Sequence, residues 1–407
     1  MKSIVLAWRN VWRNTRRSIL SIGIIGVGVA AILMVWGFMS GTFWGLRELT
    51  IATGVGHIQI GSPKSFDPAV YFDDPGLSKE TAGEIQAFAE AQDHVRFGMQ
   101  RINLEGLVTF GRTTVSFTGT GIEPAKEARL SGVFAPLTEG ENLPIGEAEG
   151  KYKALVAAGL SRSLGCHPGD TVTVLVNMSD GGLNALDLQV SGIYQTGFPE
   201  TDKRNILMSI GAAKELLGSD RINRIILSLD RTELTEEIRA LIARRFPRVE
   251  VHGWEDLAAY YHQVVQLYRN MFTIFGIIIL IVVFLSVINT MIMSIMERTR
   301  EIGTLLAIGV PERFISTVFV FEGIIIGFLG SILGTLIALV GSSCIDALAI
   351  QMPPAPGRSL PYPLNIFMDL PTVLAASAAI IFIAGVAALA PSVKAARKSI
   401  VDSLNHT

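Results

Sequence analysis

Residues 271–296 read MFTIFGIIILIVVFLSVINTMIMSIM and contain no charged side chain. A transmembrane helix needs roughly 17–25 mostly apolar residues, so this stretch predicts a helix that crosses a membrane. Residues 19–39 and 373–389 are equally uncharged, and residues 314–345 contain a single carboxyl group, that of Glu322. The sequence therefore predicts a membrane α-helical fold with four transmembrane helices, which we place at 18–40, 271–296, 314–345 and 372–390.

The amino-acid composition also points to a membrane. Hydrophobic residues make up 49% of the 407 residues and charged residues 17%, against about 25% charged residues in ordinary soluble domains. The net charge of −2 gives no reason to expect nucleic acid as a partner. The first apolar run is longer than the core of a cleaved signal peptide, which spans about 7–15 residues, so we expect an uncleaved anchor.

Basic residues mark one side of the predicted membrane. They gather in the first 17 residues, in the connection 297–313 and in the C-terminal segment 391–407, whereas the connection 346–371 contains only Arg358. Short loops rich in Lys and Arg face the cytoplasm. We therefore expect both termini and residues 297–313 in the cytoplasm, and residues 41–270 and 346–371 on the opposite side.

The N-terminal segment 1–17 has the pattern of an amphipathic helix. Its apolar residues recur at helical spacing and its arginines lie on another side, which favours a helix in the cytoplasmic membrane interface. An ordinary basic flank of the first span is the alternative. The apolar residues are Ile4, Val5, Trp8, Val11 and Trp12, and the arginines are Arg9, Arg13 and Arg16.

Residues 41–270 are the one part outside the predicted membrane that is long enough for its own core. They mix β-rich runs with helical stretches and turn signals, so we predict an α+β domain inserted between the first two spans. Its edges, 43–53 and 254–270, continue the helical pattern into the spans and predict a two-helix stalk. Strands are predicted at 57–60, 102–110, 113–118, 154–156, 171–176, 186–193, 205–208 and 224–229, and helices at 79–92, 209–217 and 235–245.

The sequence contains no recognisable motif for catalysis or metal binding. It has no G-x-x-x-x-G-K-[ST] loop, no H-E-x-x-H, no paired C-x-x-C and no G-x-S-x-G. The six histidines show no ligand-like pair, and the two cysteines cannot form a disulfide framework. We therefore predict no catalytic residue, metal site or cofactor in this chain. A membrane-bound enzyme with a polar cluster in 41–270 is a further alternative.

Residues 297–309 read ERTREIGTLLAIG, a charged turn followed by small and aliphatic residues. A short helix with Glu and Arg on one side can dock into a cleft of a soluble partner, and small residues permit close approach to neighbouring helices. A solvated loop that only satisfies the positive-inside rule is the alternative. The candidate coupling residues are Glu297, Arg298, Arg300, Glu301, Gly303, Ala307 and Gly309.

This run, followed by Phe321-Glu322-Gly323 and a Gly-rich helix, closely resembles the FtsX-like permease module of ABC transporters of the macrolide-exporter (MacB) and lipoprotein-releasing (LolC/LolE) types. The C-terminal APSVKAAR at 390–397 is similar to the closing segment of that family, and VGHIQI at 55–60 resembles the lipoprotein-releasing branch. One departure is Leu306, where the family usually carries a basic residue, so either a contact to the ATPase is lost or Arg300 and Arg313 supply it.

The resemblance implies a permease subunit of a bacterial inner membrane that works with two copies of a separate ABC ATPase, which bind ATP and magnesium. It also implies a second permease, either a copy of this chain or a sister chain, and allows for a periplasmic adaptor. We expect ATP hydrolysis to move the outer domain, an action called mechanotransmission, and to extract or export a lipidated or hydrophobic envelope molecule such as a lipoprotein. The alternatives are a non-transporting permease that activates a cell-wall hydrolase, and export of a drug or peptide from the periplasm with an adaptor.

Three sets of residues in the spans are candidates for special roles. An intramembrane carboxyl costs roughly 2.5–3.5 kcal/mol on insertion, so Glu322 predicts either a structural ion pair with a cytoplasmic-side base or a proton-carrying role. Small residues of the third span are spaced for close packing, within the chain or at a dimer seam: Gly323, Gly327, Gly330 and Gly334. Bulky apolar residues in the outer halves of the first two spans are candidates to line a cargo route: Met34, Phe38, Met39, Phe272 and Phe275.

Overall fold

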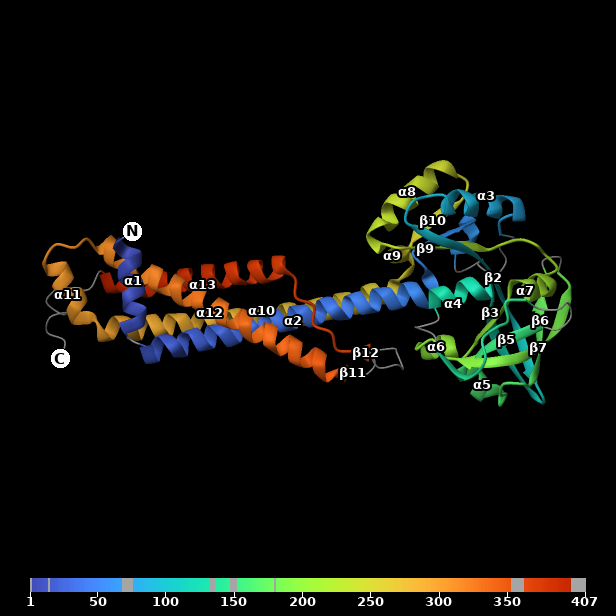
Figure 1. Cartoon of the computed structure of the whole chain (residues 1–407), viewed down its shortest axis with the longest axis horizontal. Coiled ribbons are helices and arrows are strands. Elements are labelled where there is room, and N and C mark those ends of the chain that lie inside the picture. Colours follow the sequence, from blue (N-terminus) through green and yellow to red (C-terminus); the bar gives the residue numbers. More distant parts are fainter. Residues whose placement is uncertain are drawn as a thin grey trace. The chain divides into compact units, whose positions relative to one another are not determined.

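A computed structural model describes residues 2–13, 15–67, 76–131, 136–146, 152–178, 181–352 and 362–396. The chain divides into two compact units (Figure 1). The helical unit comprises residues 1–44, 265–352 and 362–407, and the α+β unit comprises residues 45–264 and 353–361. Arg358 and residues 397–407, which entered the orientation argument, lie outside the described residues.

Four helices within the described residues are long and apolar enough to cross a membrane, which confirms the predicted number. The fourth continues through Pro391 to Ala396, beyond the predicted end at 390. The first two, α2 and α10, belong partly to the helical unit and partly to the α+β unit. The elements are α1 Lys2–Arg13, α2 Thr15–Thr50, α10 Ala259–Glu297, α11 Thr299–Ala307, α12 Glu312–Leu348, β11 Gln351–Met352, β12 Tyr362–Pro363 and α13 Leu370–Ala396.

Close helix packing in the helical unit depends on the small residues of α12. A Cβ atom on Gly334 would lie 2.5 Å from the Gly26 carbonyl oxygen of α2, and one on Gly327 would lie 2.8 Å from Cβ of Ala384 on α13. Gly330 and Gly323 make equivalent approaches to α2 and α13. All four candidate glycines therefore pack against helices of this same chain, as small-residue spacing allows in membranes. Helix α10 is the least enclosed span, with 11% of its apolar window buried against 28–39% for the other three.

Ten strands of the described chain form one sheet in the α+β unit, in the order β10-β1-β9-β2-β3-β8-β5-β7-β4, with β6 paired to β2 and β7. This arrangement confirms the predicted α+β class. The elements are η1 Ile51–Val55, β1 Ile58–Gly61, η2 Pro63–Phe66, α3 Lys79–Glu90, β2 Val95–Phe110, β3 Thr113–Ile122, α4 Pro124–Ser131, β4 Leu137–Gly140, β5 Tyr152–Ala157, α5 Ala158–Leu164, β6 Thr171–Asn177, β7 Leu183–Tyr194, α6 Pro199–Asp202, β8 Asn205–Ser209, α7 Ile210–Leu217, β9 Arg224–Leu229, η3 Thr232–Leu234, α8 Thr235–Arg245, β10 Glu250–Gly253 and α9 Trp254–Leu257.

The long strand β2 joins two parts of this sheet. Its first half, from Val95 to Arg101, pairs with β9, and its second half, from Ile102 to Phe110, pairs with β3. The sequence predicted only the second half. The missed half does alternate, since Val95, Phe97 and Met99 are apolar and the residues between them are not, so a local signal was present. Strand β9 supplies its hydrogen-bonding partners.

The prediction of a continuous helix over 254–270 is wrong at one residue. Helix α9 ends at Leu257, and Ala258 has non-helical dihedral angles (φ −99°, ψ 51°) before α10 begins at Ala259. Ala258 is buried and packs in one apolar cluster with Ile51 and Trp254. Local helical pattern does not report such a tertiary contact, which explains why the break was not predicted. On the other side, α2 runs without interruption to Thr50 and continues as a π-helical turn to Val55.

Candidate functional site

Alternating charges connect three helices of the helical unit around α11. The Nη2 atom of Arg13 on α1 lies 2.7 Å from both carboxylate oxygens of Glu301 on α11. Arg298, between α10 and α11, donates from Nε to Glu301 at 3.1 Å and places Nη1 3.5 Å from Oε2 of Glu322 on α12. Hydrogen bonds from Arg13, followed by those from Arg298, hold the pKa of Glu301 below its ordinary value. The position of α11 is therefore set jointly by α1 and α12.

Glu322 is the buried end of this chain of charges. Its exposed fraction is 4%, and Arg298, whose side chain is also largely buried, is the cation beside it. A second ion pair, between Arg17 on α2 and Glu297, joins the start of the first span to the end of α10. This geometry agrees with a structural ion pair at Glu322, and the described residues contain no further acid or base within ion-pair distance of it.

Helix α11 has one face turned into the chain and one turned outward. Thr299, Ile302 and Gly303 are buried, whereas Arg300, Ala307 and Gly309 are exposed. Leu306 packs with Leu305 onto the apolar cluster of Ile295, Ile302, Ile315 and Phe319. Leu306 is thus used here for internal packing. Gly309 ends the helix in a left-handed turn (φ 92°), so its small size serves the turn rather than a close helix contact.

The sequence interpretation missed three residues of this site. The sequence pattern places Arg13 on the polar side of an interfacial helix, counts Arg17 only among the basic residues before the first span, and gives no role to Ile308, which is 72% exposed. One signal was available, because Arg13 and Arg17 are four residues apart and so are their partners Glu297 and Glu301. The outer face of α11 therefore exposes a cation at its start, Arg300, and an apolar side chain just past its end, Ile308.

The candidate cargo-lining residues are not equivalent. Phe38 and Phe272 meet edge to face with ring centroids 6.2 Å apart, and Phe275 is half exposed. Met34 reaches toward Gly341 of α12, and Met39 is buried. Phe275 is therefore the candidate most open to a molecule outside the chain, Met34, Phe38 and Phe272 are open in part, and Met39 is not.

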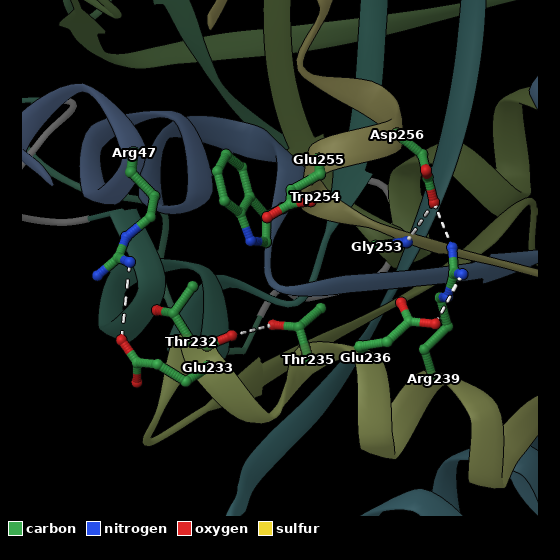
Figure 2. A pocket seen from close by; sticks show the side chains of 10 residues that line it. All are labelled: Arg47, Thr232, Glu233, Thr235, Glu236, Arg239, Gly253, Trp254, Glu255 and Asp256. Atoms are coloured by element: carbon green, nitrogen blue, oxygen red, sulfur yellow. Dashed lines mark hydrogen bonds and ion pairs between the residues drawn. The ribbon is translucent and has the colours of Figure 1, made fainter. Parts of the chain in front are cut away.

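Ion pairs also fasten the segments by which the chain enters and leaves the α+β unit (Figure 2). Arg47 near the end of α2 lies 3.6 Å from Glu233, and Arg239 on α8 contacts Asp256 of α9 at 2.6 Å. Asp256 also accepts a hydrogen bond from the Gly253 amide. These residues line a cavity of about 540 Å³, in which the basic and acidic side chains face one another. No cluster of potential metal ligands occurs in the described part of the chain.

The entry and exit strands of the α+β unit pair directly with each other. Strand β1, which follows η1, lies between β10 and β9, and Ile58 stands opposite Gly253. Arg101 on β2 donates to the Gly54 carbonyl in η1 and forms a two-pronged pair with Glu127 on α4, 2.8 Å from each oxygen. The end of α2 and the start of α9 are therefore attached to the sheet by strand pairing, ion pairs and apolar packing together.

His57, beside this junction, is buried and held neutral. Its Nδ1 accepts a hydrogen bond from the Leu229 amide at 3.2 Å, so Nε2 carries the proton and faces the Thr232 hydroxyl at 3.3 Å. Burial, with smaller contributions from Arg47 and Arg96, lowers the pKa of His57 from 6.5 to about 4.

Comparisons with known proteins cover nearly the whole chain. Residues 18–245 match the MacB-like periplasmic core domain, and residues 273–400 match the FtsX-like permease C-terminal family. The lipoprotein-releasing system transmembrane protein LolC of Neisseria meningitidis is 22% identical over 78% of this chain and 75% of its own length. The ABC transporter permease YvrN of Bacillus subtilis is 22% identical over the full length of both chains. The macrolide export protein MacB of Nitrobacter winogradskyi is 25% identical over 54% of this chain and 34% of its own.

Proposed function

The chain belongs to the FtsX-like, MacB-type family of ABC transporter permeases, and from this premise we propose that it transmits ATP-driven movement of a partner ATPase to its α+β unit. As a permease of this family it is a multi-pass membrane protein with an extracytoplasmic domain, and the ATPase resides in a partner chain. Two copies of that ATPase, with ATP and magnesium, and a second permease complete the proposed assembly. Both termini and α11 face the cytoplasm in this arrangement.

One observation carries the proposal. The chain enters the α+β unit through β1 and leaves it through β10, and these two strands are neighbours in one sheet. A displacement of the first long helix is therefore passed to the sheet through η1 and β1, because no long unstructured linker lies among residues 45–67. The second long helix is joined to β10 through α9 and the non-helical residue Ala258.

Helix α11 is the proposed ATPase contact. Its outer face offers Arg300, Ala307 and Ile308, while its inner face is fixed by Ile302 and the Arg13–Glu301 pair. A helix that is fixed in this way should move as a rigid body with the bound ATPase instead of bending. Replacing Ile308 with Asp should weaken ATPase binding, and Ile145→Asp, an equally exposed isoleucine of the α+β unit, serves as control.

The proposed cargo is a lipidated or hydrophobic envelope molecule, such as a lipoprotein, that is taken up beside α2 and α10. Support comes from the flexible and aromatic apolar groups at Phe38, Phe272 and Phe275 and from the low burial of α10. The similarity of the chain to a lipoprotein-releasing system transmembrane protein also supports a lipidated cargo.

Photocrosslinking tests this route. Photoreactive residues at Phe38 and Phe275 are compared with Ile337 on α12 and Phe382 on α13, in cells that carry radioactive palmitate. Labelling of acylated molecules at the first pair should fall when the complex hydrolyses ATP and stay high with a non-hydrolysable analogue. Bulk lipid should label the 71%-exposed Phe382 regardless of nucleotide. Equal, nucleotide-independent labelling at all four positions would overturn the cargo proposal.

Export of a drug or peptide with an adaptor is the second candidate, because a macrolide export protein is among the relatives. It requires a small-molecule substrate to stimulate ATP hydrolysis by the reconstituted complex, whereas acylated proteins should not.

A further inference from the structure

A separate apolar cavity of about 410 Å³ lies in the α+β unit between α4 and the sheet. Its volume falls in the range of roughly 300–1,000 Å³ that is typical of small-molecule sites. Most of the wall is aliphatic, and Ile122, Leu143, Leu155 and Leu207 in it belong to a small apolar cluster distinct from the main core. Ile145 also lines the cavity. Ile145 is 84% exposed, so this side chain stands at the mouth of the cavity.

One polar group on the cavity wall lacks a partner. Tyr194 lines the cavity with only 2% of its surface exposed, and no group in the described part of the chain hydrogen-bonds its hydroxyl. Burial, followed by the nearby Asp202 and Glu127 carboxylates, raises the pKa of Tyr194, so the hydroxyl keeps its proton. A buried donor without an acceptor is costly, and a ligand that brings an acceptor would remove that cost.

The charges at the cavity decide which acceptor fits. Among the described residues that line the cavity, Glu127 is the charged one, and Arg101 pairs with both of its oxygens. A carboxylate or phosphate ligand would meet this negative charge, and the described lining residues include no cation to offset it. An uncharged carbonyl oxygen meets no such repulsion.

We propose that this cavity binds an uncharged acyl ester. Its acyl chain lies along Ile122, Leu143 and Leu155, and its carbonyl oxygen accepts a hydrogen bond from the Tyr194 hydroxyl. The site is a binding site, and no covalent step occurs in it. The proposal goes beyond the proposed transport function and does not depend on it, since a resident lipid and a transported one have the same ester chemistry.

Binding is measured on the full chain in nanodiscs, with a fatty-acid methyl ester that carries a photoreactive diazirine. Adducts should map to peptides that contain Leu143, Ile145 or Tyr194, and the free acid should label them far less. Ala128→Trp should abolish this labelling, because Ala128 lines the cavity but is exposed, so that the larger ring fills the space without disturbing the fold. Ala87→Trp on α3, at an exposed alanine outside the cavity, is the matched control.

Tyr194→Phe separates the hydrogen bond from the shape of the site. The variant should bind the ester about 2–10-fold more weakly, the effect of one neutral hydrogen bond. Its melting temperature without ligand should equal or exceed that of the wild type, because the removed hydroxyl has no partner in the free protein. A destabilised Tyr194→Phe variant with unchanged ester binding would contradict the assignment of the hydroxyl.

Competition distinguishes the two sources of such an ester. A diacylglycerol that displaces the probe identifies a resident lipid, and a synthetic diacylated lipopeptide that displaces it identifies lipidated protein; either result supports the site. Equal labelling of wild type and Ala128→Trp, or equal labelling by ester and free acid, overturns the proposal. These outcomes do not involve the ATPase, so they are independent of the transport test.

Discussion

At the scale of single residues, His57 makes the α+β unit sensitive to acid. Its pKa is about 4 in the folded chain and 6.5 in the unfolded chain, so the unfolded state binds more protons between these values. Stability is therefore fully present above pH 6.5, falls as the pH drops from 6.5 to 4, and loses on the order of 3 kcal/mol by pH 4. Protonation of Nδ1 would also remove the hydrogen bond from the Leu229 amide.

The measurement is the melting temperature of the full chain between pH 4 and pH 7. His57→Asn keeps an acceptor near the Leu229 amide but cannot titrate, so its melting temperature should depend less on pH than that of the wild type. His167→Asn, at an exposed histidine of the same unit, is the control and should leave the wild-type slope unchanged. The same slope in His57→Asn as in the wild type would show that other groups cause the acid sensitivity.

Gly56 is the residue at which the chain turns from η1 into β1. Its φ of 67° favours glycine, and a Cβ atom there would lie 2.2 Å from Cγ2 of Ile226. Gly56→Ala should therefore destabilise the α+β unit by about 2 kcal/mol or more, since backbone strain alone costs about 1–3 kcal/mol. Gly83→Ala on α3, where no atom lies within 4 Å, should instead stabilise by about 0.5–1 kcal/mol. Denaturant unfolding of both variants provides the comparison.

At the scale of elements, the Arg13–Glu301 ion pair joins α11 to α1. Both side chains are about half exposed, so the pair contributes only about 0–1 kcal/mol to stability and its role is to position the helix. Arg13→Gln and Glu301→Gln should each lower permease-coupled ATP hydrolysis by roughly 3–10-fold, and the double variant should lose no more than either single one. Additive losses would mean that Glu301 contacts the ATPase directly. Glu200→Gln with Lys203→Gln, an exposed pair of the α+β unit, is the control.

The elements that the sequence predicted are those whose own residues determine them. The four spans follow from uncharged runs, and β9 and α8 have the predicted bounds because their apolar patterns are complete within the segment. Strand β10, with the sequence EVHG, has no such pattern and exists because β1 pairs with it. The same distinction applies to the candidate site. A local motif predicts the α11 residues, whereas the contact of Arg13 with Glu301 joins residues far apart in the sequence and has no local motif.

At the scale of the whole molecule, the proposed mechanotransmission depends on the connection from α2 through η1 into the sheet. The Arg101 contact to the Gly54 carbonyl and the packing of Ile51 on Trp254 leave this connection little freedom. A Gly-Ser-Gly insertion between Val55 and Gly56 would add a flexible joint at this point without touching α11. ATPase binding and basal hydrolysis should therefore stay near wild type, while release of cargo from membranes should fall by about tenfold or more, on the order of 1.4 kcal/mol in coupling.

The matched control is the same insertion in the turn between β2 and β3, after Gly111, where a Cβ atom would meet no other atom within 4 Å. This variant has the same added length in the same unit but leaves the entry strand unchanged, so cargo release should remain within about twofold of wild type. Equal melting temperatures of the two insertion variants would establish that both are folded. If the Val55 insertion then still released cargo at the wild-type rate, rigid coupling through β1 could not be the way in which movement reaches the α+β unit. Loss of release in both variants would place the requirement in the whole sheet and not in the junction, because the turn at Gly111 is remote in sequence from both α2 and α9.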